Sequence, residues 1–143
     1  MGRLLGLDYG RKRVGVALSD SLKMTAQPFE TWPGKTWEGI SKRLSACVME
    51  YEVEAVIIGL PLLLTGESGS MAKEVHRFCR YIEKHISVPV HFVDERLTSV
   101  QSRRVMREMG TKKNDKEGKT DQISAQIILQ LYLDIINKKT KEG

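Results

Sequence analysis

The chain is 143 residues long, which predicts a single domain over residues 1–143 with a substantial hydrophobic core. Hydrophobic residues make up 41% of it and charged residues 29%, as in an ordinary globular protein. No segment approaches the roughly 18 apolar residues of a membrane-spanning helix, and the N-terminal apolar run is too short for a secretory signal, so we exclude both classes and expect a cytoplasmic protein. The net charge of +5 favours a polyanionic partner without identifying one.

The first third of the chain predicts extended structure. Residues 3–8 and 13–19 form two strands, because apolar residues alternate with small residues in the second and a short turn containing Gly10 separates them. This spacing is typical of an antiparallel hairpin. A third extended segment lies within residues 24–32, where Pro28 favours the edge of a sheet.

After residue 36, helical and extended patterns alternate. We expect helices at 37–51, 70–86, 98–109 and 120–137, strands at 55–60 and 88–93, and a polar loop at 110–119. Residues 55–60 form a continuous apolar run that is typical of a strand buried on both faces. Thr98 and Gln101 fit a capping box at the start of the third helix, and Gly110 fits a left-handed cap at its end.

The order of these elements predicts an α/β fold. Helical connections imply parallel strand pairs, so one mixed five-stranded sheet with helices on both faces accounts for the pattern. Cys47 and Cys79 each lie on an apolar helical face, and we expect two buried, reduced core residues. In sheets of this kind, ligands bind near the carboxyl ends of the parallel strands.

Acidic residues gather at that end of the predicted sheet. Asp8 closes the first strand, Asp94 and Glu95 follow the fifth, and Asp121 opens the last helix. Clustered carboxylates raise one another's pKa unless a cation offsets them, and hard oxygen ligands suit Mg²⁺ or Mn²⁺. Two such ions can activate a water for phosphodiester cleavage. Because side chains alternate along a strand, we expect only one of Asp94 and Glu95 to reach the ion.

Each acidic residue also has a simpler interpretation. Asp8 could accept backbone hydrogen bonds in the hairpin turn, Asp94 could hold Arg96, and Asp121 could cap the helix. Basic residues follow the acidic ones, namely Lys12, Arg13, Arg96, Arg103, Arg104, Arg107, Lys112, Lys113, Lys116 and Lys119. If they converge, they frame the acidic centre and bind phosphates with salt-dependent affinity; otherwise they form a solvated surface.

Four segments resemble motif blocks of a known family. LGLDYGRKRVGVALSD, IIGLPL, DERLTS and KTDQISAQIILQLYL are similar, in the correct order, to the blocks of the YqgF/RuvX family of pre-16S rRNA nucleases, which is also described as Holliday-junction-resolvase-like. The resemblance spans essentially the whole chain. It implies an RNase H-like fold with strand order 3-2-1-4-5, strand 2 being antiparallel, and maturation of the 5′ end of 16S ribosomal RNA in the cytoplasm. It also implies kinship with RuvC-like resolvases, which cut branched DNA with Mg²⁺ or Mn²⁺.

The resemblance assigns roles to individual residues. Asp8, Glu95 and Asp121 match the family's catalytic and metal-binding acids, although the resolvases carry the acid corresponding to Glu95 on the neighbouring strand. Lys12, Arg13 and Arg96 match its substrate-binding basic residues. The chain departs from the family pattern at Leu63-Leu64-Thr65-Gly66, which replaces a more polar loop, at Ser124 in place of the usual Ala, and at Ser99 in place of Thr.

We therefore expect a nuclease that uses two Mg²⁺ or Mn²⁺ ions to hydrolyse phosphodiester bonds in precursor ribosomal RNA, with the ribosome as a further partner. A resolvase of branched DNA is the first alternative. A non-catalytic RNA-binding assembly factor is the second, and a nucleotide-binding ATPase is the third, because the D-Y-G-x-K-x-x-G pattern at residues 8–15 also resembles the phosphate hairpin of the actin and sugar-kinase group. Both a monomer and a homodimer are compatible with the sequence.

Overall fold

The structure is a computed structural model that describes residues 2–108 and 118–142. Its strands are β1 (Arg3–Asp8), β2 (Arg13–Ser19), β3 (Ala26–Pro33), β4 (Val53–Leu60) and β5 (Val90–Asp94). Its helices are α1 (Trp37–Glu50), α2 (Ser70–Glu83), the 3₁₀ helix η1 (Glu95–Leu97), α3 (Val100–Glu108) and α4 (Lys119–Glu142). None of the helices in these ranges is long and apolar enough to cross a membrane.

The strands form one mixed sheet in the order β3-β2-β1-β4-β5. β2 runs antiparallel to β1 and β3, whereas β4 runs parallel to β1 and β5. This confirms the predicted hairpin, the parallel pairs joined by helices and the edge position of the strand that contains Pro28. β4, the continuous apolar run, lies between β1 and β5 and is buried along most of its length, as predicted.

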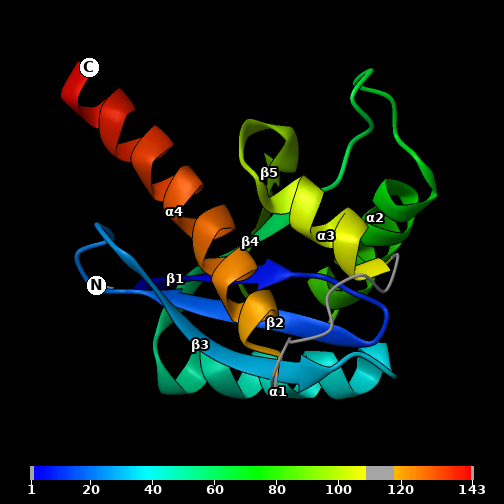
Figure 1. The fold of residues 1–143 in the computed structure, drawn as a ribbon. Helices are drawn as coiled ribbons and strands as arrows, with labels where there is room; N and C mark the ends of the chain where they lie inside the picture. Colours follow the sequence, from blue (N-terminus) through cyan, green and yellow to red (C-terminus); the bar gives the residue numbers. More distant parts are fainter. Residues whose placement is uncertain (1, 109–117, 143) are drawn as a thin grey trace.

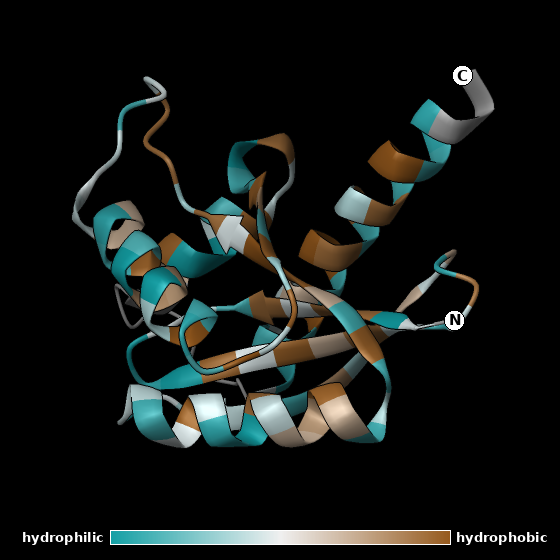
Figure 2. Ribbon diagram, turned by 180° about the vertical axis from the view of Figure 1, so that it is seen from behind, coloured by the Kyte–Doolittle hydropathy of each residue, from teal (hydrophilic) through white to brown (hydrophobic). Residues whose placement is uncertain are grey.

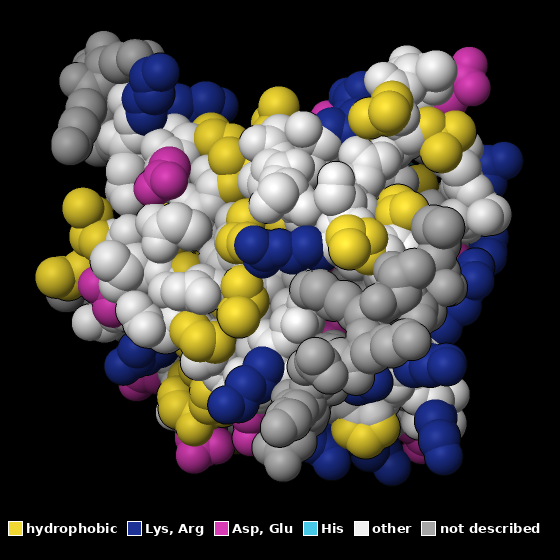
Figure 3. All heavy atoms as spheres, in the orientation of Figure 1, with side chains coloured by type: hydrophobic (Ala, Val, Ile, Leu, Met, Phe, Trp, Pro, Cys, Tyr) yellow, Lys and Arg dark blue, Asp and Glu magenta, His cyan; other side chains and the backbone are white. Residues whose placement is uncertain are grey.

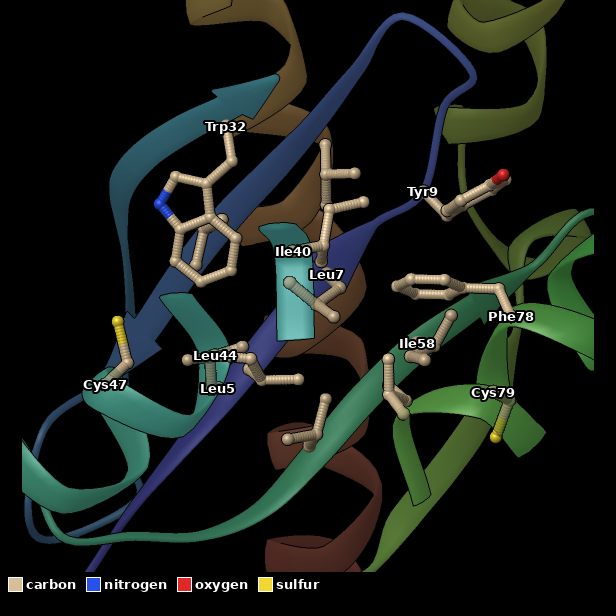
Figure 4. Close-up of a cluster of buried hydrophobic side chains, with 14 of the residues drawn as sticks. Leu5, Leu7, Tyr9, Trp32, Ile40, Leu44, Cys47, Ile58, Phe78 and Cys79 are labelled. Carbon is tan, nitrogen blue, oxygen red and sulfur yellow. The ribbon is translucent and has the colours of Figure 1, made fainter. Parts of the chain in front are cut away.

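Helices cover both faces of the sheet, which confirms that prediction (Figure 1). α1 and α2 pack on one face, where large side chains of the sheet and both helices form the main core, including Leu7, Trp32, Ile58 and Phe78 (Figure 4). α4 crosses the other face, and Val100 of α3 packs in the same smaller core. Hydrophobic residues are concentrated along the strands between these layers (Figure 2). Cys47 and Cys79 are buried and free, as predicted.

Several element boundaries differ from the predicted ones. α2 ends at Glu83, before the expected residue 86, and β5 spans Val90–Asp94 where 88–93 was predicted. α4 continues to Glu142, past the predicted end at 137. The predicted loop at 110–119 and the cap at Gly110 lie almost wholly outside the described residues.

The start of α3 is a clearer correction. η1 was not predicted, and α3 begins at Val100, two residues after the expected Thr98. The Thr98 hydroxyl accepts a hydrogen bond from the Val100 amide at 3.1 Å. Gln101 does not close the predicted capping box, because its side chain donates to the Leu62 carbonyl at 2.5 Å. A long-range contact has therefore replaced a local one.

Glycines let α4 lie directly on the sheet. A Cβ atom at Gly15 of β2 would stand 1.9 Å from the Asp121 carbonyl oxygen, and a Cβ atom at Gly6 of β1 would stand 2.8 Å from Leu129 Cβ. At Gly59 of β4, it would meet an α4 side chain at 2.6 Å. Because real Cβ atoms do not approach this closely, a side chain at any of these positions on three adjacent strands would force α4 or its neighbouring side chains to move.

Ser124 lies in the middle of this crossing. It follows Asp121, which packs on Gly15, by about one helical turn, and it precedes Ile128, which packs on Gly59, by about one turn. Ser124 is completely buried. Among the described residues, its hydroxyl oxygen is the one buried side-chain polar atom that has no hydrogen-bond partner. α4 thus presents a buried hydroxyl toward the sheet face that holds Asp8, at a cost in stability.

We predict that Ser124→Ala stabilises the ligand-free protein by about 1 kcal/mol, because removing an unsatisfied buried hydroxyl removes its desolvation penalty. Urea unfolding in a chelator would measure the change. Ser41→Ala is the matched control, since Ser41 is also a buried helical serine but donates to the Glu38 carbonyl at 2.9 Å. This control should be neutral or destabilising, and a Ser124→Ala protein that is less stable than wild type would contradict the prediction.

Candidate active site

Asp8 stands at the end of β1, in the middle of the sheet. It pairs with Gly15 of β2, and the parallel register of β1 and β4 brings Gly59 to its other side. Alternation along β1 places Asp8 on the same face as Gly6, which is the face that α4 covers. The residue is 1% exposed. Asp8 therefore brings a buried carboxylate to the carboxyl end of a central strand, as the sequence predicts.

Two further acidic residues lie over the glycines that flank Asp8. A Cβ atom at Gly59 would stand 2.5 Å from Glu95 Oε1, and one at Gly15 would meet the backbone and Cβ of Asp121. Glu95 and Asp121 are both buried. The three predicted acids therefore follow one another across β4, β1 and β2, and glycine leaves the room that the two outer acids occupy.

Arg104 joins two of these acids. Its Nη2 donates to Asp8 Oδ1 and, at 2.5 Å, to Glu95 Oε1, while its Nε donates to Glu95 Oε2 at 3.1 Å. Its Nη1 donates to the carbonyl oxygen of Tyr9. Arg104 is only 4% exposed, so one buried guanidinium is hydrogen-bonded to two buried carboxylates.

This position of Arg104 corrects both interpretations of it from the sequence, a place on a solvated surface and a place in a basic frame around the acids. The residue instead lies among them, because α3 turns one face toward the sheet and Val100 and Arg104, four residues apart, share that face. The spacing from Val100 is a signal that could have indicated burial. Nothing local indicates that the partners of Arg104 would be Asp8 and Glu95.

Asp121 is paired separately. Its Oδ2 accepts a hydrogen bond from Arg13 Nε at 2.8 Å, and the Arg13 side chain remains 43% exposed. Asp121 lies in the first turn of α4, which begins at Lys119, so it is not the N-cap residue. A carboxylate in the first turn interacts favourably with the helix dipole, which is part of the simpler interpretation of this residue.

The adjacent acids Asp94 and Glu95 diverge. Asp94 accepts from the Arg96 amide at 2.9 Å and binds the Arg96 guanidinium through both oxygens, the shortest contact being 2.6 Å to Nη2. Hydrogen bonding to this guanidinium holds the pKa of Asp94 below its ordinary value. The interpretation that Asp94 holds Arg96 is therefore confirmed, and Glu95 is the acid that lies beside Asp8.

The arrangement of two carboxylate oxygens fits a hard divalent cation. Asp8 Oδ1 and Glu95 Oε1 both accept from a single nitrogen, so two carboxylate oxygens converge on one cationic position, as Mg²⁺ or Mn²⁺ requires. The unpartnered Ser124 hydroxyl lies on the same face of the sheet. As the side chains stand, no three His, Cys, Asp or Glu residues of the described ranges are grouped closely enough to hold an ion. The three-acid metal site stays a prediction.

The predicted basic residues occupy different settings. Lys12 is exposed in the turn that follows Asp8, whereas Arg13 and Arg96 are engaged by Asp121 and Asp94. Figure 3 shows Lys and Arg side chains distributed over this side of the molecule. Lys112, Lys113 and Lys116 lie outside the described residues, as does the side chain of Arg107. Phosphate binding by Lys12, Arg13 and Arg96 stays a prediction.

Comparisons with solved structures agree with the fold. An RuvC from Thermus thermophilus, solved with a Holliday junction substrate, superimposes with a TM-score of 0.57 at 15% identity and covers 93% of this chain and 94% of that one. A fowlpox virus resolvase, solved with Holliday junction DNA, gives a TM-score of 0.51 at 19% identity over 94% and 98% of the two chains. The chain has the RNase H-like fold of these resolvases.

Sequence comparisons define the family. A protein from Syntrophus aciditrophicus named "Putative pre-16S rRNA nuclease" is 39% identical over 96% of this chain and 91% of its own length. A protein of the same name from Bacteroides thetaiotaomicron is 42% identical over 94% and 97% of the two chains. The family model described as RuvX, Holliday junction resolvase, matches residues 2–135. The chain therefore belongs to the RuvX family.

Proposed function

We propose that the protein is a nuclease that hydrolyses phosphodiester bonds with the help of one or two Mg²⁺ or Mn²⁺ ions, and that its substrate is the 5′ region of precursor 16S ribosomal RNA. The main support is the convergence of Asp8 and Glu95 on one buried cationic position at the carboxyl ends of β1 and β5. The names of relatives that are about 40% identical over nearly their whole length supply the substrate class. In this proposal the protein acts in the cytoplasm, and the ribosome that contains this RNA is a further partner.

The acids have distinct positions in this scheme. Asp8 and Glu95 would hold the divalent cation, and Asp121, over the neighbouring strand, would complete the set of ligands. The cation would supply a water of lowered pKa and neutralise charge on the phosphate. Hydrolysis would form a bond from a water oxygen to phosphorus and break the bond from phosphorus to the leaving oxygen. The attacking water would lose one proton, and the leaving oxygen would take one up. Because Asp8 and Glu95 are buried, the attraction between their carboxylates and the cation would be stronger than in water.

Basic side chains near the acids would hold the flanking phosphates. Lys12 is exposed in the β1–β2 turn, and Arg13 and Arg96 lie beside Asp121 and Asp94. A phosphate that approached Arg13 or Arg96 would share or replace the carboxylate that each now binds. The contribution of these residues should therefore depend on salt concentration, as expected for phosphate contacts.

Branched DNA is the second candidate substrate. It is favoured by the family description and by the fold shared with resolvases that were solved with Holliday junctions. Resolution of a junction requires two cuts and therefore a second active site, which a homodimer would supply, whereas trimming of ribosomal RNA can be done by a monomer. Comparing a structured precursor RNA with a four-way DNA junction separates the two substrates, and binding without cleavage of either would favour an assembly factor.

We predict that Asp8→Asn lowers cleavage of the preferred substrate by more than about a hundredfold, because active-site electrostatic contacts are commonly worth this much or more. Substrate binding and melting temperature should stay close to wild type, since Asn keeps the shape of Asp. Single-turnover cleavage of both substrates with Mg²⁺ or Mn²⁺ measures the effect. Asp94→Asn is the matched control. Asp94 lies at the same edge of the sheet, but it binds Arg96 and makes no described contact with Arg104. Normal cleavage by Asp8→Asn would remove the basis of the proposal.

A second prediction concerns substrate binding. Lys12→Ala should weaken RNA binding and lower the slope of log affinity against log salt concentration by about 1, the change expected when one phosphate contact is lost. Lys42→Ala is the control, because Lys42 is an exposed lysine of α1, on the opposite face of the sheet, where it pairs with Glu38 at 3.3 Å. Titrations at several salt concentrations would measure both. Equal slopes for the two variants would place the substrate elsewhere.

A further inference from the structure

The position between Asp8 and Glu95 is filled by a side chain of the protein itself. Arg104 Nη2 donates to Asp8 Oδ1 and to Glu95 Oε1, so this nitrogen occupies the point toward which both oxygens are directed. The guanidinium also bonds the second oxygen of Glu95 and the Tyr9 carbonyl, so every part of it is engaged. An arginine side chain cannot lose its proton in a protein, so this cation is permanent.

We propose that Arg104 is a resident counter-cation, which holds the two carboxylates together until a divalent ion takes its position, so that binding of the ion and release of Arg104 are one coupled step. The inference rests on the proposed function only in assuming that Asp8 and Glu95 bind a divalent ion. It adds that the ion must compete with a residue of this chain, and that the competition moves α3.

The two cations exclude each other for geometric and electrostatic reasons. Mg²⁺ binds carboxylate oxygens at about 2.0–2.1 Å, a distance that leaves no room for a guanidinium nitrogen on the same side of the same two oxygens. Two positive charges within a few ångströms also repel strongly in a buried site. A guanidinium brings one positive charge to the two carboxylates, whereas a divalent ion brings two. This difference in charge favours the exchange.

Release of Arg104 would loosen α3. Among the α3 side chains that the structure describes, those of residues 100–106, only Val100 and Arg104 are buried, while Val105 and Met106 are 47% and 46% exposed. Gln101 fixes the first turn through the Leu62 carbonyl. Helices as short as α3 are not stable on their own, so the contacts of Arg104 help to stabilise its second half. The identity of the cation between Asp8 and Glu95 is thereby linked to the stability of α3.

The first test measures Mn²⁺ affinity by calorimetry, without nucleic acid, in wild type, Arg104→Gln and Arg103→Gln. Arg103 is the matched control, because it is the adjacent half-exposed arginine of α3 and has no described bond to the acids. We expect Arg104→Gln to bind Mn²⁺ about tenfold or more tightly than wild type, since a competing cation is removed, and Arg103→Gln to stay within about twofold. With a chelator present, Arg104→Gln should melt below wild type, because two buried carboxylates lose an oppositely charged partner.

A second measurement needs no variant and stays decisive if Arg104→Gln does not fold. Hydrogen exchange of the wild-type protein is compared in chelator and in saturating Mn²⁺. We expect amides of α3 to exchange faster with Mn²⁺, and those of β1 and β4 to exchange at the same rate or more slowly. A ligand that simply rigidified the protein would slow exchange in α3 as well, so slower or unchanged exchange there would overturn the inference.

These outcomes are separate from the success of the proposed function. Cleavage with Mn²⁺, together with equal Mn²⁺ affinity in wild type and Arg104→Gln, would overturn the role of Arg104 and leave the nuclease proposal standing. Tighter binding by Arg104→Gln in a protein that cuts neither RNA nor DNA would support the role of Arg104 and count against the nuclease. Failure of all three proteins to bind Mn²⁺ would also overturn the inference.

Discussion

The burial of two carboxylates side by side is the constraint on which the rest of this site depends. Asp8 and Glu95 are almost completely shielded from water, and two like charges in such a place repel each other and require a cation. The structure satisfies the requirement with Arg104, which must reach them from a separate helix. The short 3₁₀ turn after β5 and the burial of one face of α3 both serve to bring the acids and the guanidinium together.

The two faces of the sheet meet different demands. On the face covered by α1 and α2, large side chains such as Trp32 and Phe78 fill the space and provide most of the hydrophobic stabilisation (Figure 4). On the face covered by α4, Gly15 and Gly59 have no side chains, so Asp121 and Glu95 can lie directly against the sheet. A methyl group at either position would push out Asp121 or Glu95. The same sheet can therefore hold a close-packed core and a polar centre, because small residues are confined to one face.

The sequence predicts the fold far better than it predicts the charges around the site. Alternation indicates β2, and the bounds predicted for β1 and β2 are both confirmed. The strand order follows from the resemblance of the motif blocks and is confirmed as well. η1 and the start of α3 were missed because the Asp94 side chain and the Leu62 carbonyl capture groups that a local cap would use. Arg104 was misplaced because its partner Asp8 lies 96 residues away, and periodicity carries no information about such a pair.

The acids at this edge of the sheet are already distributed among arginines. Asp94, the last residue of β5, binds Arg96, and Asp121 binds Arg13. Glu95, the first residue of η1, binds Arg104, which also binds Asp8. A phosphate that approached alone would meet guanidinium groups that are engaged, and a divalent ion alone would have to displace Arg104. If ion and phosphate arrived together, the ion would bind the carboxylates of Asp8 and Glu95, and the phosphate would bind the guanidinium of Arg104 that the ion displaces. Under the proposed function, each buried charge would then exchange one oppositely charged partner for another, which is the condition that the burial of Asp8 and Glu95 imposes.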